Sequence, residues 1–492
     1  MEESTLPNKM ELQHIIYNLL ETQIRFGRYR CGDSLPVIKE ASSYFCVSVD
    51  TVRLAYVRLR QEGYISLSTC VGGTVIVDYS EEEIALHIRD YFSCRRESLL
   101  AFAQSVGVLA NYAQWIALRT ATPEELDELE RICLKQEIPP LFRMSRLIQL
   151  LYGRLGNDML LNLEWQMFLF FLAPFVAIPN NPALQPAEVS PLILMINHAR
   201  RKDWLALWNE GERNENQYYT ALSRFYEDNP FPAPACGEPV AFTWDIHRKA
   251  SQLCYSLSTD IMVRIQRGIY PFGSYLPSPK MLAAEYHVGL NTVRRAIDLL
   301  NKLGAVQSVN GVGTRVLQPW ENVQNCDFSD SLIRRRLMNF LESSHILSLS
   351  CRDCARITVR GLSGEDRTRW VEELEEVRAS GYYESLFYIC YDAISRYAPW
   401  PVIRTVYAGL NRQLTWGLPI RNLHGDREEV NAYFLPYLDT LEDSLRRADG
   451  SAFSLALERL QITETACVAA FLHSHGIKEA ADIVLPEPEP HT

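Results

Sequence analysis

The sequence predicts a mainly α-helical protein in which a winged helix-turn-helix domain followed by an all-helical domain occurs twice. Residues 24–63 and 265–304 are identical at 14 of 40 positions in a gap-free alignment, which indicates an internal duplication. The long segment after each copy is rich in Leu, Ala, Glu and Arg with apolar residues at helical spacing. These observations predict four domains, at residues 10–78, 79–235, 248–318 and 328–482.

Each copy starts with a helical pattern of apolar residues. These residues are Leu12, Ile15, Ile16, Leu19 and Leu20 in the first copy, and Leu257, Ile261 and Ile265 in the second. Gly27 and Gly32 then interrupt the chain around a short loop, as Gly268 and Gly273 do in the second copy. A Leu-Pro pair follows and predicts the start of a second short helix, because proline fits the first helical turn.

A third helix is predicted from about Asp50 to Glu62, and in the second copy from Asn291 to Leu303, each followed by a glycine in C-cap position. One face of this helix is apolar, and Arg53, Arg294 and Arg295 point away from it. Two short β-type runs joined by a Gly-containing turn follow, at 64–68 and 74–77 in the first copy and at 305–309 and 315–317 in the second. Three helices and a two-stranded ribbon form a winged helix-turn-helix.

These segments resemble the N-terminal domain of the GntR family of bacterial transcription regulators. The second copy matches the family pattern with GIYPFGSYLPSPKMLA, VGLNTVRRA and GVGTRV, and the first with GRYRCGDSLPVIKEAS, VSVDTVRLA and GGTVIV. The resemblance implies that the winged helices bind DNA. Two positions depart from the pattern: the serine after Leu-Pro is Val37 in the first copy but Ser278 in the second, and the arginine after Val-Ser is Val49 and Leu290. Both copies also have Lys where the family has Arg in the second helix.

A helix that reads the major groove needs cationic or amide side chains on its first turns, with further cations beside the phosphates. In the second copy the candidate DNA contacts are Lys280, Asn291, Thr292, Arg294, Arg295 and Arg315. In the first copy they are Lys39, Thr51 and Arg53. Asn291 is also a candidate N-cap for the third helix, and a solvated helix face is the alternative interpretation of the arginines.

The net charge of −11 taken alone argues against nucleic acid as a partner, but the charge is unevenly distributed. Residues 248–318 carry 9 Lys+Arg and 3 Asp+Glu, a net +6, whereas residues 10–78 are neutral. Residues 79–247 and 319–492 each carry −8. Because phosphate contacts supply much of the affinity for DNA, the second winged helix is the stronger candidate. The first is expected to bind weakly or to serve partly as a packing partner.

The two helical segments resemble the ligand-sensing FCD domain of a GntR subgroup. The resemblance rests on ATPEELDELE, on Gly156-Asn157 after an apolar helix, and on the hairpin LILMINHARRKDWLALWNEGERN. It implies a small molecule as a candidate effector. That subgroup commonly binds a metal through one Asp and three His, but the matching helix 142–156 contains no His and His198 stands alone. We therefore expect neither a metal nor another cofactor.

Two further groups of residues in the helical segments are candidates for a metal site or a pocket. Cys351 and Cys354 form a single CxxC motif, which supplies too few ligands for a structural zinc site. Four aromatic residues are candidates to line a pocket, although a place in the buried core is the favoured alternative. They are Trp165, Phe168, Phe170 and Phe171. No P-loop, nucleophile elbow or dinucleotide fingerprint occurs in a credible context. The interrupted helical segments also exclude a continuous pyridoxal-phosphate domain, so no enzymatic activity is predicted.

The remaining features indicate a cytoplasmic protein. The start, MEESTLPNKMELQ, is acidic and polar and predicts no secretory signal. The apolar run 167–178 is short and contains Pro174, which predicts a buried core helix and no membrane span. Twelve cysteines without regular spacing predict free thiols. The Pro-rich residues 229–239 are read as a linker or an ordered loop.

Together these observations predict a DNA-binding transcription regulator whose partner is double-stranded DNA. Fusion of two halves predicts a pseudo-dimer within one chain, or a homodimer of such chains. The alternative is a non-enzymatic sensor or interaction protein in which the winged helices serve as scaffold.

Overall fold

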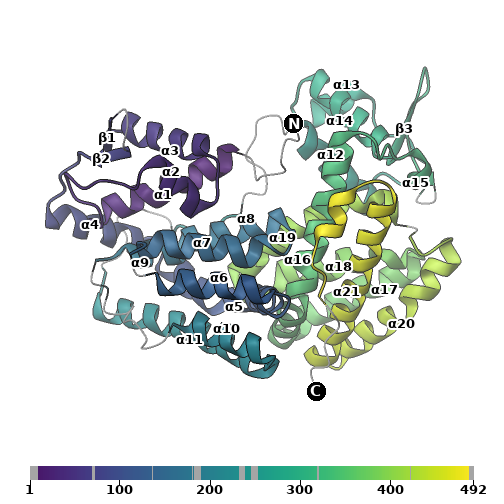
Figure 1. The fold of residues 1–492 in the computed structure, drawn as a ribbon. Coiled ribbons are helices and arrows are strands. Elements are labelled where there is room, and N and C mark those ends of the chain that lie inside the picture. Colours follow the sequence, from purple (N-terminus) through teal and green to yellow (C-terminus); the bar gives the residue numbers. More distant parts are fainter. Residues whose placement is uncertain are drawn as a thin grey trace. The chain divides into compact units, whose positions relative to one another are not determined.

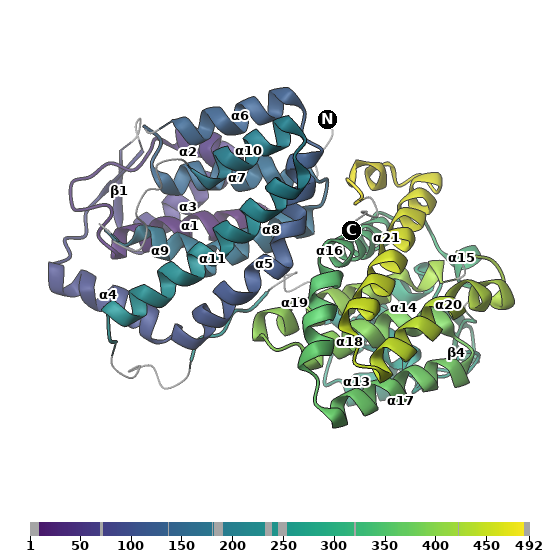
Figure 2. The ribbon, with the colours of Figure 1, turned by 90° about the horizontal axis from the view of Figure 1, so that it is seen from below.

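The chain forms two compact units in the computed structural model, one of residues 1–244 with 400–402 and one of residues 245–399 with 403–492 (Figures 1 and 2). The residues that the structure describes are 9–68, 72–135, 137–179, 181, 190–231, 239–244, 253–318, 321–421 and 423–486. Each unit holds one winged helix and one all-helical domain, and the described strands form two two-stranded ribbons. The predicted mainly α-helical, duplicated fold is therefore confirmed. Most of the predicted linker at 229–239 lies outside the described residues.

The first winged helix has the predicted order of elements. These are α1 (Lys9–Arg25), α2 (Ile38–Phe45), α3 (Val49–Gln61), β1 (Ile65–Ser68) and β2 (Gly72–Val75). The helix α3 begins slightly earlier than predicted because the Oγ of Ser48 caps it, accepting from the backbone N–H of Thr51 at 3.2 Å. Gly63 follows the helix with φ +82°, a left-handed conformation that glycine adopts without strain.

The second winged helix repeats this arrangement. It consists of α12 (Leu253–Gln266), α13 (Pro279–Glu285), α14 (Leu290–Lys302), β3 (Val306–Val309) and β4 (Gly313–Val316). The strands pair antiparallel from Val306 opposite Val316 to Val309 opposite Gly313. The N-cap of α14 is Gly289, which has no side chain to bond to the helix. The interpretation of Asn291 as a cap is therefore wrong: it lies inside the first turn with its side chain exposed.

The helical domain of the first unit surrounds one long apolar helical stretch. Its elements are α4 (Glu81–Ser93), α5 (Arg96–Arg119), α6 (Pro123–Leu134), α7 (Pro140–Gly153), α8 (Asp158–Met167), η1 (Phe168–Leu172), α9 (Ala173–Ala177), α10 (Pro191–Arg201) and α11 (Trp204–Asp228). Among the described residues, only the stretch Asp158–Ala177 is long and apolar enough to cross a membrane, and 67% of its most apolar window is buried in the protein. Trp165, Phe168 and Phe171 are all buried there, so the predicted aromatic core is confirmed, with Phe170 half-buried beside them.

The helical domain of the second unit is built on two long helices, α16 (Ser331–Gly361) and α21 (Gly450–Ser474), that pack against each other. The other elements are α15 (Asn322–Asn325), α17 (Gly364–Ser380), η5 (Tyr383–Ser385), α18 (Leu386–Tyr397), α19 (Pro401–Leu414), η6 (Thr415–Ile420), α20 (Arg427–Arg446) and η7 (Lys478–Asp482). Leu337 of α16 and Trp416 of η6 belong to the same buried apolar cluster as Ile261 of α12. The second winged helix and its helical domain therefore share one hydrophobic core.

The cysteines depart from the prediction at one position. Nine described cysteines are free thiols, but Cys94 is disulfide-bonded. The prediction that all the cysteines are free is wrong at this residue, because pairing depends on which residues the fold brings together and not on their spacing along the chain. Cys351 and Cys354 are buried in α16, where burial raises the pKa of both thiols. No group of three metal-ligating side chains lies close together among the described residues.

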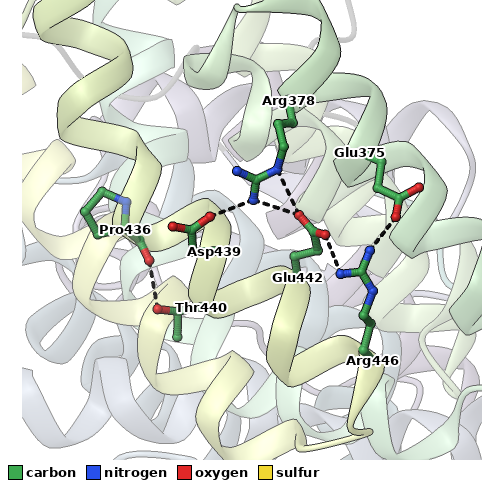
Figure 3. Close-up of polar contacts among 7 residues, drawn as sticks. All are labelled: Glu375, Arg378, Pro436, Asp439, Thr440, Glu442 and Arg446. Carbon is green, nitrogen blue, oxygen red and sulfur yellow. Dashed lines mark hydrogen bonds and ion pairs between the residues drawn. The ribbon is translucent and has the colours of Figure 1, made fainter.

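An ion-pair network joins α17 to α20 in the second unit (Figure 3). Glu442 is buried and lies at its centre, with Arg378 donating at 2.8 Å to one carboxylate oxygen and Arg446 pairing with the other. Arg378 also bonds to Asp439 at 2.7 Å, and Arg446 pairs with Glu375. Burial raises the pKa of Glu442, but the hydrogen bonds from Arg378 and Arg446 outweigh this effect and hold the pKa below its usual range.

We expect Glu442→Gln to lower the free energy of unfolding by about 2 kcal/mol at neutral pH, the range for hydrogen bonds to charged groups. A carboxylate whose pKa falls on folding stabilises the protein above its unfolded-state pKa, and this contribution is lost as the pH falls through the folded-state value. The difference between the wild type and the variant in urea unfolding should therefore shrink on acidification. Glu375→Gln, at a half-exposed position, is the control and should cost under about 0.5 kcal/mol. A difference that does not change with pH would contradict this role.

Candidate nucleic-acid interface

The outer face of α14 presents exposed cations. Arg294 and Arg295 are exposed, as is Asn291 one turn earlier, while Val293 and Ala296 on the opposite face are buried. No carboxylate among the described residues pairs with either arginine. Thr292 is half-buried beside them. The arrangement leaves two guanidinium groups and one amide free to donate to base edges or phosphates.

The corresponding face of α3 in the first winged helix is neutral and partly apolar. Arg53 is exposed, but it forms an ion pair with Asp50 one turn away. Val49 and Leu54 are 39% and 45% exposed on the same helix. Thr51 is only 2% exposed, and its Oγ lies 2.8 Å from the Oγ of Ser48. The side chain of Thr51 is therefore buried and engaged at the start of α3 in this structure.

The turn between the second and third helices is covered in the first unit. Arg146 of α7 donates to the backbone carbonyl of Ser43 at 2.9 Å and to the Sγ of Cys46 at 2.8 Å, and it also pairs with Glu128 of α6 at 3.1 Å. Phe142 of α7 packs against the ring of Phe45, with centroids 5.2 Å apart. Figure 1 shows α7 running along the winged helix at this place. An acidic helical domain therefore holds the helix-turn-helix of the first copy.

In the second unit the same turn faces solvent. His287 stands where the first copy has Cys46, has the same left-handed backbone, with φ 51°, and is exposed. Met281 of α13 is 63% exposed. Arg264 of α12 ties α13 to its own domain through an ion pair with Glu285, and this hydrogen bond raises the pKa of Arg264. Arg264 thus ties the second helix-turn-helix to α12 of the same winged helix, and the turn itself is exposed.

The two lysine candidates occupy equivalent places on the second helix of each copy. Lys39 on α2 and Lys280 on α13 are both exposed. The helix α13 is capped by the Oγ of Ser278, which accepts from the backbone N–H of Met281 at 3.4 Å. The N-cap residue of α2 is Val37, whose side chain cannot cap the helix. The departure from the family pattern at Val37 therefore removes a cap and leaves the lysine in place.

The tip of the wing in the second copy is exposed, but the candidate cation on this wing, Arg315, already forms an ion pair. Arg315 on β4 pairs with Glu321 at 3.0 Å, and its side chain is 29% exposed. Tyr275 pairs with Arg315 as an isolated β-bridge, and its ring lies 3.3 Å from where a side chain on Gly313 would begin. Tyr275 is 51% exposed at the wing, and the sequence patterns did not mark it. Tyr275 stands where the first copy has Ser34, which forms the equivalent bridge to Thr74.

The C-terminal end of α14 is anchored to the helical domain of the second unit. The Nζ of Lys302 donates to Asp330 at 3.1 Å, and Asp330 also caps α16 by accepting from the backbone N–H of Leu332 at 2.8 Å. The hydrogen bond from Lys302 holds the pKa of Asp330 below its usual range. Asp330 therefore joins α14, the candidate DNA-reading helix, to α16.

Comparison with known proteins matches both winged helices. The model of "Bacterial regulatory proteins, gntR family" matches residues 12–75 and 257–316. The chain is 43% identical over 67 residues to the "Probable transcriptional regulator PhnF" of Escherichia coli (strain K12), which is 13% of this chain and 28% of that protein. The chain thus spans little more than a quarter of the length of this curated relative.

Two solved structures are also similar. Streptococcus agalactiae GntR is 15% identical, with 43% of this chain and 99% of that chain covered and a TM-score of 0.22. E. coli McbR/YncC is 20% identical, with 44% of this chain and 98% of that chain covered and a TM-score of 0.22.

Proposed function

We propose that this chain, whose two winged helices belong to the GntR family of bacterial regulatory proteins, is a DNA-binding transcription regulator that reads DNA mainly with its second winged helix. The observation that carries the proposal is the outer face of α14. Arg294 and Arg295 are exposed there without a carboxylate partner among the described residues, in a segment with a net charge of +6. A duplex presents phosphates and base acceptors, which such a surface complements.

Each candidate residue takes a defined part in this proposal. Arg294, Arg295 and Asn291 would meet base edges in the major groove, with Thr292 beside them. Lys280 would contact a phosphate from α13. Arg315 would contribute less than its position suggests, because Glu321 already pairs with it.

The first winged helix would support binding without reading sequence. Lys39 is exposed and suits a phosphate contact, but Arg53 is engaged by Asp50 and Thr51 is buried. The packing of α7 on its helix-turn-helix supports a mainly architectural role. The fused halves would then act as an unequal pseudo-dimer, alone or within a homodimer, in the bacterial cytoplasm.

The second candidate function is a non-enzymatic sensor or interaction protein with the winged helices as scaffold. The shared core of the second winged helix and its helical domain is compatible with that role. The experiment that separates the two is selection of duplex DNA from a random pool by the full chain. The regulator predicts enrichment of one sequence motif, whereas a pool that remains random after repeated rounds would favour the scaffold.

A further inference from the structure

The side chain of Asn301 joins α14 to the wing of the second copy, which is the ribbon of β3 and β4. Its Oδ1 accepts from the backbone N–H of Ser308 on β3 at 2.8 Å, and its Nδ2 donates to the Oγ of Ser308 at 3.0 Å. The Oγ of Ser308 also lies 3.1 Å from the Oγ1 of Thr314 on β4. These three residues, which we call the wing latch, connect the last turn of α14 to both strands of the wing.

The amide of Asn301 is fully engaged within the protein. Its Nδ2 also donates to the backbone carbonyl of Ile297, one turn earlier, at 2.8 Å. Because a side-chain amide has two N–H donors, both are used and neither is left for a nucleic acid. Asn301 also follows Asn291 by ten residues, which is about 15 Å along a helix. Asn301 therefore lies apart from the candidate base contacts on the first turns of α14, and its bonds fix the wing.

The first copy lacks the wing latch. At the same places in the duplication it has Arg60, Leu67 and Gly73. Leucine and glycine carry no polar side-chain group, and Arg60 is exposed on α3. The side chains that tie the third helix to the wing are thus a difference between the two copies, like the charges on their third helices.

The other edge of the ribbon is held in the same way in both copies. The backbone N–H of Leu276 donates to the carbonyl of Thr314 on β4 at 2.8 Å. In the first copy the backbone N–H of Leu35 donates to the carbonyl of Gly73 on β2 at 2.8 Å. The latch acts on the opposite strand, β3, and is therefore an addition of the second copy to the frame that both winged helices share.

The latch lies close to the tip of the wing. Only one residue pair, Val309 with Gly313, separates it from the turn. The tip is exposed and carries Asn310, whose amide can donate to a phosphate or a base edge. A two-stranded ribbon is at best marginally stable without packing. A side-chain bond at this point therefore limits how far the tip moves relative to α14.

We propose that Asn301 is a positioning residue for DNA reading by the second winged helix. Through Ser308 and Thr314 it holds the tip of the wing at a set distance from the first turns of α14, so that helix and wing meet the duplex together. Two contacts that are already in place lose less conformational entropy on binding than a helix with a swinging wing. This inference rests on the proposed function and deepens it, since it gives a second reason for the unequal roles of the copies.

The test is hydroxyl-radical footprinting of the full chain on the duplex selected from the random pool. We expect saturating wild-type protein to protect two groups of nucleotides, and the group that Arg294→Ala weakens is assigned to α14. Asn301→Ala should lose protection in the other group, beneath the wing, and keep it in the group of α14. Its affinity for the duplex should fall about two- to tenfold, the range for one lost hydrogen-bonded contact.

Two further variants serve as rescue and control. Ser308→Thr keeps the hydroxyl of the latch on a residue that suits a strand, and both groups should stay protected. Asn229→Ala removes an amide bond of the same kind, to the carbonyl of Phe225 one turn earlier, from the end of α11 in the first unit. It should leave both groups unchanged.

Two footprinting results would overturn the proposal. One is protection beneath the wing that Asn301→Ala leaves intact. The other is equal weakening of both groups at saturating protein, because a residue that matters only for folding lowers the active fraction and does not separate the two groups.

The latch is also tested without DNA, by hydrogen exchange of the full chain. The backbone amide of Ser308 should exchange about tenfold faster in Asn301→Ala, which removes its acceptor. The amide of Leu276, on the other edge of the ribbon, should change little. Equal exchange of Ser308 in the two proteins would overturn the latch. If Ser308 depends on Asn301 but the wild type selects no duplex, the proposed function is overturned while the latch itself stands.

Discussion

Replacing Arg294 by alanine is expected to weaken binding of the full chain to its selected DNA about 5- to 150-fold. A well-placed bidentate contact to a base is worth about 1–3 kcal/mol, and Arg294 is exposed on the first turns of α14 with no carboxylate partner among the described residues. The loss should be larger for the selected sequence than for unrelated duplex, because only a base contact discriminates between sequences. Fluorescence anisotropy with both duplexes measures the two affinities.

Arg53→Ala is the matched control for Arg294→Ala, since the two arginines occupy the same position in the two copies. The guanidinium of Arg53 is engaged by Asp50, and its winged helix is neutral overall. We expect the affinity to change by less than about twofold, as for a contact worth under about 0.5 kcal/mol. Equal losses from the two variants would contradict the unequal roles of the winged helices. No loss from either would exclude reading by the third helix altogether.

Leu337→Ala is expected to lower the free energy of unfolding of the second unit by about 2–5 kcal/mol, the usual cost of truncating a fully buried leucine. Leu337 is 0% exposed on α16 and belongs to the cluster that also contains Ile261 and Val293 of the winged helix. Because the two domains share this core, the space left by the truncated side chain should destabilise both domains. Hydrogen exchange of backbone amides in α14 and α21 measures the two domains in one experiment.

The matched control lies five residues earlier on the same helix. Leu332 is 45% exposed, so Leu332→Ala should cost under about 0.5 kcal/mol. In Leu337→Ala, the protection of backbone amides from hydrogen exchange should fall in both α14 and α21. Loss of protection in α21 with α14 unchanged would show that the second winged helix folds independently of its helical domain, against the shared core.

The duplication and the local patterns predicted most of the fold. Apolar residues at helical spacing, such as Ile16 and Ile261, are buried where the pattern placed them. The glycines after the third helices, Gly63 and Gly304, both adopt positive φ. These features depend on neighbours within one helical turn or one loop, which is the range that a sequence pattern reports. The exposed positions of Arg294 and Arg295 follow from the same periodicity.

The features that the sequence did not predict depend on contacts between distant segments. The cap at Ser48 buries Thr51, and Glu321 occupies Arg315. Arg146 and Asn301 have no local motif, yet one holds a helix-turn-helix and the other joins α14 to the wing. Net charge by segment predicted which winged helix is the stronger candidate for reading DNA, but only the side-chain partners show which arginines are engaged.

The dependence of DNA affinity on salt tests the central claim most directly. For the full chain on its selected duplex, the logarithm of the association constant should fall linearly with the logarithm of salt concentration, by about 0.9 for each phosphate contacted. Lys280→Ala should reduce this slope by about 0.9, because it removes one phosphate contact from the second winged helix. A slope near zero, or a slope that Lys280→Ala leaves unchanged while Lys39→Ala lowers it, would contradict DNA reading by the second winged helix.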